Sequence, residues 1–127
     1  MFVDSSFWVG LADRRDQWHP RAKLLAGKVA PGARLLDVTG CEALTIVGSR
    51  LGGKAASRLF DYLQDSCEIL YMDREMLDRS MDRHLSFDGR LSVADCATVE
   101  AMTQLDDSSI LSFDSDFDRV KGLTRIH

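Results

Sequence analysis

Short apolar runs of strand length alternate with longer segments of helical period along the chain. The runs of strand length occupy residues 1–3, 33–38, 68–72, 108–113 and 123–126. A strand that is followed by a helix and a further strand builds a parallel sheet, because the helix carries the chain back across the sheet. The sequence therefore predicts an α/β sandwich around a mainly parallel sheet of about five strands.

The segments between these runs predict helices, each with one apolar face. The first helix follows Ser5 or Ser6, one of which is expected to cap it. Two helices separated by Gly52-Gly53 form an αα-hairpin, in which Phe60 is expected to face inward. The helix over residues 73–85 is expected to direct Leu77, Met81 and Leu85 into the core.

Length and charge limit the classes of function. A chain of 127 residues suits one domain, which we expect to span residues 1–127. The formal charge of −4 and the isoelectric point of about 5.3 argue against a protein that holds nucleic acid through a broad positive field. No apolar run approaches the roughly 20 residues of a membrane helix, and no basic leader precedes Asp4, so we expect neither a membrane partner nor a signal peptide.

Acidic residues fall at the expected ends of strands and starts of helices. Asp4 follows the first strand and Asp114 follows the fourth, while Glu42 and Asp95 are expected in the first turns of two helices. These positions all lie at one edge of a doubly wound sheet, so four carboxylates are expected to share a cleft. Their mutual repulsion favours bound cations, and Mg²⁺ or Mn²⁺ suits all-oxygen ligands. Two such ions can activate water and stabilise the leaving oxygen in phosphodiester cleavage.

Each acid also has a structural explanation. Thr39–Glu42 fits a capping box and Ser92–Asp95 fits a weaker one. Asp4 or Asp114 can form an Asx-turn or an N-cap. The residue pattern leaves both interpretations open, and the shared sheet edge is what favours a metal site.

Several segments carry a resemblance to a known family: MFVDSSFWVGLADRRDQWHPRA at the start, TGCEALTIV in the middle, and LSVADCATVEAM with ILSFDSDFDRVKGL near the end. In order and spacing, over essentially the whole chain, they resemble PIN-domain ribonucleases of the VapC toxin type. The resemblance implies a three-layer α/β/α PIN-like fold. It also implies that the family's metal-binding acids are matched by Asp4, Glu42, Asp95 and Asp114, and an additional acid by Asp116.

By this resemblance the protein is a Mg²⁺- or Mn²⁺-dependent endoribonuclease and the toxin of a type II toxin–antitoxin pair. The family further implies a homodimer and a cognate antitoxin whose tail fills the acidic groove. We therefore predict four catalytic acids, Asp4, Glu42, Asp95 and Asp114. We predict four metal ligands, Asp4, Asp95, Asp114 and Asp116.

Further residues are candidates for contact with RNA or a partner. Ser5 and Ser6 stand beside the first acid. Arg50, Lys54 and Arg58 cluster around the tip of the αα-hairpin, where RNA phosphate, an oligomer contact and an antitoxin contact all remain open.

Aromatic residues and cysteines have simple interpretations. Trp8 and Trp18 are expected to pack in or beside the core, with stacking against nucleic-acid bases as the alternative. The three cysteines show no CxxC spacing, which indicates reduced thiols and a cytoplasmic protein.

Two non-catalytic functions are alternatives. A receiver-like signalling module has a similar size and an acidic pocket, and Asp73 after the third strand would be its phospho-acceptor. The lysine that such a module needs soon after the fourth strand is missing, because the next lysine is Lys121. The other alternative is a PIN-like module that binds RNA or a partner without cutting.

Overall fold

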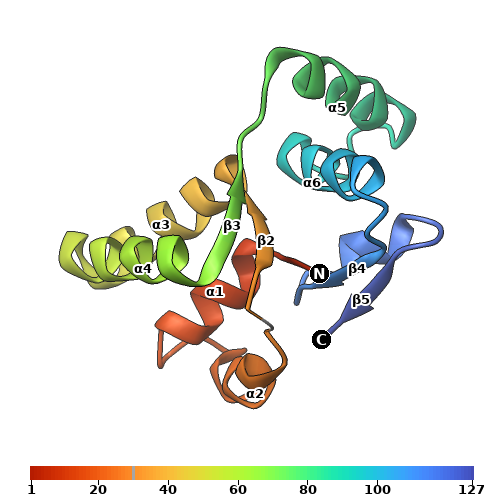
Figure 1. Ribbon diagram of the computed structural model, residues 1–127. Helices are drawn as coiled ribbons and strands as arrows, with labels where there is room; N and C mark the ends of the chain where they lie inside the picture. Colours follow the sequence, from red (N-terminus) through yellow and green to blue (C-terminus); the bar gives the residue numbers. More distant parts are fainter. Residues whose placement is uncertain (30) are drawn as a thin grey trace.

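A five-stranded sheet forms the centre of the protein, whose computed structural model describes residues 1–29 and 31–127 (Figure 1). The strands are β1 (Phe2–Val3), β2 (Ala33–Leu36), β3 (Cys67–Leu70), β4 (Ser109–Leu111) and β5 (Thr124–Ile126). Their order is β3-β2-β1-β4-β5, and every neighbouring pair is parallel. The predicted parallel sheet is confirmed, and each of the five strands is shorter than its apolar run.

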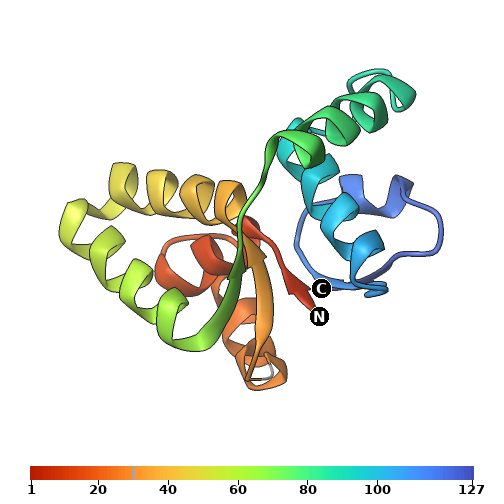
Figure 2. The same ribbon diagram turned by 45° about the horizontal axis from the view of Figure 1, so that its top comes forward.

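Helices cover both faces of this sheet. They are α1 (Ser5–Ala12), α2 (His19–Leu25), α3 (Asp37–Leu51), α4 (Gly53–Ser66), α5 (Arg74–Ser86) and α6 (Val93–Gln104), with the 3₁₀ helices η1 (Ala26–Lys28) and η2 (Ser115–Arg119). In Figures 1 and 2, α1 to α4 lie on one side and α5 and α6 on the other. The three-layer α/β/α architecture is confirmed. Within the described residues, no helix is long and apolar enough to cross a membrane.

Alternate strand residues enter two separate cores, because successive side chains of a strand point to opposite faces. The core beneath α1 to α4 contains the strand residues Val3, Leu35 and Leu111. The core beneath α5, α6 and η2 contains their chain neighbours Phe2, Leu36 and Ile110. These short strands are therefore buried on both faces, as parallel sheets require.

The strand order reverses at β1. The chain moves outward from β1 to β2 and β3 on one side, and later fills β4 and β5 on the other. The N–H of Asp4 donates to the carbonyl of Leu111 at 2.9 Å, which fixes the ends of β1 and β4 side by side. A reversal of this kind is where ligands bind in open α/β sheets.

Two helix starts differ from the sequence prediction. Asp4, and not Ser5 or Ser6, caps α1, because its side chain accepts the N–H of Ser6. Helix α3 begins at Asp37 directly after β2, so Glu42 lies in its second turn. The predicted capping box at Thr39–Glu42 is therefore wrong.

Helix α5 is rotated relative to the prediction. Leu77, Met81 and Leu85 are 39%, 47% and 77% exposed, whereas Met76 and Ser80 are buried. Ion pairs explain the rotation, since Arg79 and Arg83 both reach Glu100 on α6, at 3.6 Å and 2.6 Å. The inward assignment of Phe60 on α4 is also wrong, because its side chain is 43% exposed.

The rotation of α5 predicts unequal effects at two adjacent positions. Met76→Ala should lower the free energy of unfolding by about 2–3 kcal/mol, because it opens a cavity in the core. Leu77→Ala should lower it by less than about 1 kcal/mol, because that side chain is partly solvated already. Urea denaturation of both variants measures the difference, and equal losses would contradict this orientation of α5.

Candidate active site

A cleft of about 530 Å³ opens at the edge of the sheet where β1 and β4 end. It is lined by side chains from five separate segments of the chain. Its acids are Asp4, Glu42, Asp95, Asp114 and Asp116. The structure thus brings the four predicted catalytic acids, and the additional acid, to one cleft.

Asp4 lies deepest in the hydrogen-bond network of this cleft. Asp4 is 4% exposed, and its carboxylate accepts a long hydrogen bond of 3.5 Å from the Ser5 hydroxyl and three shorter ones. The donors are the N–H of Ser6 at 3.2 Å, the Ser6 hydroxyl at 2.6 Å and the Ser112 hydroxyl at 2.8 Å. Asp4 is therefore both the N-cap of α1 and a cleft acid, so the two interpretations of the sequence are compatible.

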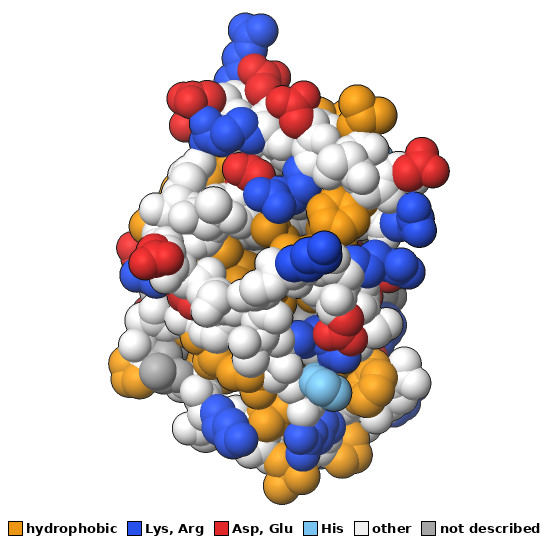
Figure 3. Space-filling view, turned by 90° about the vertical axis from the view of Figure 1, so that its right-hand side faces the viewer, with side chains coloured by type: hydrophobic (Ala, Val, Ile, Leu, Met, Phe, Trp, Pro, Cys, Tyr) orange, Lys and Arg blue, Asp and Glu red, His pale blue; other side chains and the backbone are white. Residues whose placement is uncertain are grey.

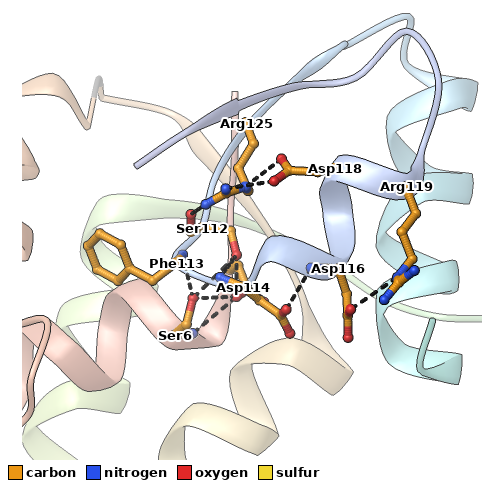
Figure 4. Close-up of polar contacts among 9 residues, drawn as sticks. Ser6, Ser112, Phe113, Asp114, Asp116, Asp118, Arg119 and Arg125 are labelled. Carbon is orange, nitrogen blue, oxygen red and sulfur yellow. Dashed lines mark hydrogen bonds and ion pairs between the residues drawn. The ribbon is translucent and has the colours of Figure 1, made fainter. Parts of the chain in front are cut away.

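The segment after β4 is tied to the same network (Figure 4). The Ser112 hydroxyl accepts the N–H of Asp114 at 3.0 Å, and the Ser6 hydroxyl accepts the N–H of Phe113 at 2.9 Å. Asp114 in turn caps η2 by accepting the N–H of Asp116 at 2.8 Å. The carboxylate of Asp116 pairs with Arg119 at 3.1 Å, so a basic side chain already partners it.

Glu42 and Asp95 reach the cleft from helices on opposite faces of the sheet. The Ser5 hydroxyl donates to Glu42 at 2.8 Å, which joins the start of α1 to α3. Asp95 lies in the first turn of α6, where its N–H donates to the N-cap hydroxyl of Ser92 at 3.0 Å. The capping half of the predicted Ser92–Asp95 box is present, and the Asp95 carboxylate lines the cleft.

Among the acids of the cleft, Asp95 has the most strongly shifted pKa. Burial raises the pKa of Asp95 to about 7, and a hydrogen bond with Ser92 opposes that rise. The negative charges of Asp4, Asp114 and Glu42 contribute smaller parts of the same rise in the pKa of Asp95. A carboxylate among like charges favours its protonated form unless a cation compensates.

The family of this chain follows from comparison with known proteins. The sequence model of the PIN domain family matches residues 1–123. This chain belongs to the PIN domain family. No curated protein sequence matches it significantly.

Solved structures share the PIN fold of this chain. Mycobacterium tuberculosis VapC20, described as a sarcin–ricin loop cleaving toxin, superimposes with a TM-score of 0.86 at 23% identity. That match covers 93% of this chain and 92% of VapC20. VapBC2 from Rickettsia felis, bound to a DNA fragment from its promoter, gives a TM-score of 0.68 at 10% identity, covering 98% and 96% of the two chains. These likenesses establish the fold.

The donor chemistry of this PIN domain fits a divalent cation. The cleft acids offer only oxygen atoms, which Mg²⁺ and Mn²⁺ prefer. Burial and, to a smaller extent, the neighbouring acids raise the pKa of Asp95, so a bound cation would favour its ionised form. Across residues 1–29 and 31–127, no three acid, histidine or cysteine side chains already form a closed ligand cluster.

The three basic residues predicted at the tip of the αα-hairpin contribute to different surfaces. Arg50 lines the acidic cleft and pairs with Asp16 at 2.7 Å and Asp13 at 3.4 Å. Arg58 instead lines a separate apolar groove of about 330 Å³ between α1, α3 and α4, and Lys54 is exposed.

Sequence reasoning did not assign several of the residues that line the cleft. Trp18 and Arg90 line it, together with Asp16 and Gln17 from the connection before α2. Arg90 lies close in sequence to Asp95, and this proximity was the available signal. The expectation that Trp18 packs in or beside the core did not place it in the acidic cleft, where its side chain lies.

The pKa of Asp95 predicts how the stability of the metal-free protein varies with pH. Its folded value of about 7 lies above the ordinary 3.8, so the folded state holds a proton that the unfolded state has released. This contribution is complete below about pH 4 and is lost as the pH rises through about 7.

Wild-type protein should therefore lose stability relative to Asp95→Asn over that range, by on the order of a few kcal/mol. Urea denaturation in EDTA at a series of pH values measures the difference. Added Mg²⁺ or Mn²⁺ should flatten the wild-type curve. Parallel curves for the two proteins in EDTA would contradict the origin of the pKa shift.

Proposed function

We propose that this PIN domain, spanning residues 1–127, is a divalent-metal-dependent endoribonuclease that hydrolyses RNA phosphodiester bonds as the toxin of a type II toxin–antitoxin pair. The observation that carries the proposal is the convergence of Asp4, Glu42, Asp95 and Asp114 on one cleft. Membership of the PIN family supports it. Likeness to VapC20, a toxin that cleaves the sarcin–ricin loop, supports it further.

The cleft residues divide into acids that hold cations and hydroxyls that hold the acids. Asp4, Asp95 and Asp114 would bind Mg²⁺ or Mn²⁺, with Asp116 as a further ligand once it leaves Arg119. When bound, the cation would supply Lewis acidity to the attacking water and to the leaving oxygen. Glu42 would help to hold that water or the cation beside the other acids.

Ser5 and Ser6 act through the acids in this account. Their hydroxyls donate to Glu42 at 2.8 Å and to Asp4 at 2.6 Å, so each fixes one carboxylate. These bonds hold the carboxylates in place before the substrate arrives, which reduces the reorganisation required during the reaction.

The partners we propose are an RNA substrate, a cognate antitoxin protein and a second copy of this chain. The apolar groove lined by Trp8, Leu59 and Tyr62 supports contact with a protein, and Arg58 at its edge is a candidate contact residue. Lys54 remains a candidate at the hairpin tip. Because none of the three cysteines is in a disulfide, we place the protein in the cytoplasm.

The receiver-like alternative is not favoured. Asp73, its phospho-acceptor, caps α5 by accepting the N–H of Met76 at 2.7 Å and does not line the acidic cleft. An assay of RNA cleavage tests the other alternative, a PIN domain that binds RNA or a partner without cutting.

Wild-type protein should cleave RNA in Mg²⁺ or Mn²⁺ and lose this activity in EDTA. Asp4→Asn and Asp95→Asn should each lower kcat/KM by about 100-fold or more, because each removes a cation ligand. Asp73→Asn is the matched control, since asparagine is an equally good N-cap, and it should retain wild-type activity. Equal cleavage by wild type and both cleft variants would contradict the assignment.

A further inference from the structure

Trp18 is a partly exposed aromatic side chain in the acidic cleft. Its side chain is 39% exposed and lines the same cleft as Asp4, Asp95 and Asp114. Its ring stacks on Phe113, with 5.0 Å between ring centroids and an interplanar angle of 11°. Since Phe113 directly precedes Asp114, the stack is adjacent to the acids.

The indole of Trp18 is held in a fixed position. A Cβ at Gly10 would lie 3.3 Å from the Trp18 Cβ and 3.5 Å from the Phe113 ring, so the bare glycine allows Trp18 to pack against α1. The backbone N–H of Trp18 donates to the carboxylate of Asp16 at 2.8 Å. A side chain fixed in this way loses little conformational entropy when a ligand stacks on it.

Arg50 secures the same loop from α3. Its guanidinium contacts the second carboxylate oxygen of Asp16 at 2.7 Å, and Asp13 at 3.4 Å. Asp16 therefore holds the backbone of Trp18 with one oxygen and Arg50 with the other. This arrangement makes Asp16 and Arg50 positioning residues for Trp18.

The surface charge favours binding of RNA through local contacts rather than through a broad positive field. The net charge is −4, and the face that lies to the right in Figure 1 carries Lys and Arg side chains interspersed with Asp and Glu (Figure 3). Stacking on an aromatic ring needs no net positive charge. It is also available to every base, because each has a π-face.

We propose that Trp18 is a stacking platform for an unpaired base close to the scissile phosphate. A base within a duplex is already stacked on its neighbours and cannot reach a protein ring. The proposal rests on the ribonuclease function and adds a residue that positions the RNA in the cleft.

A randomised pool of 20-nucleotide single-stranded RNA tests the platform. Trp18→Ala should lower kcat/KM by about 10- to 100-fold, the effect of losing one base–aromatic stack. Trp18→Phe should stay within about threefold of wild type, because it keeps an aromatic face. Phe60→Ala is the control, since Phe60 is similarly exposed at 43% but does not line the cleft, and it should cleave like wild type.

Two further measurements separate stacking from a general loss of structure. RNA should quench tryptophan emission in wild type but not in Trp18→Phe, which retains only the buried Trp8. In an oligonucleotide taken from the cleaved pool, one abasic site near the cut should lower wild-type kcat/KM about as much as Trp18→Ala does. The same abasic site should have little further effect on Trp18→Ala.

These experiments can reject the stacking role of Trp18 and the ribonuclease function separately. Cleavage by wild type and Trp18→Ala at equal rates overturns the platform and leaves the ribonuclease intact. Cleavage of a matched duplex pool at the same rate as the single-stranded pool also overturns the platform. So does a Trp18→Ala variant that cleaves RNA like wild type and differs only in weaker inhibition by an antitoxin. Absence of cleavage by wild type together with quenching of Trp18 overturns the ribonuclease and leaves a site that binds single strands.

Discussion

The buried carboxylate of Asp4 joins three parts of the chain that are distant in sequence. It follows β1, caps α1 and accepts the hydroxyl of Ser112 at the end of β4. Its own N–H donates to Leu111, so the backbone pairing of β1 with β4 and the position of the carboxylate are coupled. Asp4 therefore lies at the edge where the strand order reverses, which is where ligands bind in open α/β sheets.

Like charge is the second constraint, and it links stability to function. The fold places Asp95 among Asp4, Glu42 and Asp114, and burial raises the pKa of Asp95 to about 7. The metal-free fold thus retains unfavourable electrostatic energy near neutral pH, which a cation bound only to the folded state offsets. Active sites commonly keep such locally destabilising groups because the chemistry requires them.

Strand-end acids such as Asp114 were predictable, because the period of the pattern fixes the strands and parallel topology fixes their shared edge. The face of α5 was not, since the spacing of Leu77, Met81 and Leu85 suits a core face and an exposed face equally. Arg83 and Glu100, on different helices, decide between them. The place of Trp18 was also hidden, because it depends on contacts with other segments of the chain that no local pattern encodes.

Binding of a divalent cation by the cleft acids underlies both the proposed chemistry and the pH dependence of stability. A crystal grown in Mn²⁺, with anomalous diffraction measured at the manganese edge, locates any bound ion. We expect a manganese peak within about 2.0–2.2 Å of oxygen atoms from Asp95 and at least one of Asp4 and Asp114. The absence of a peak in the cleft at millimolar Mn²⁺, or manganese bound only outside the cleft, would rule out this metal site.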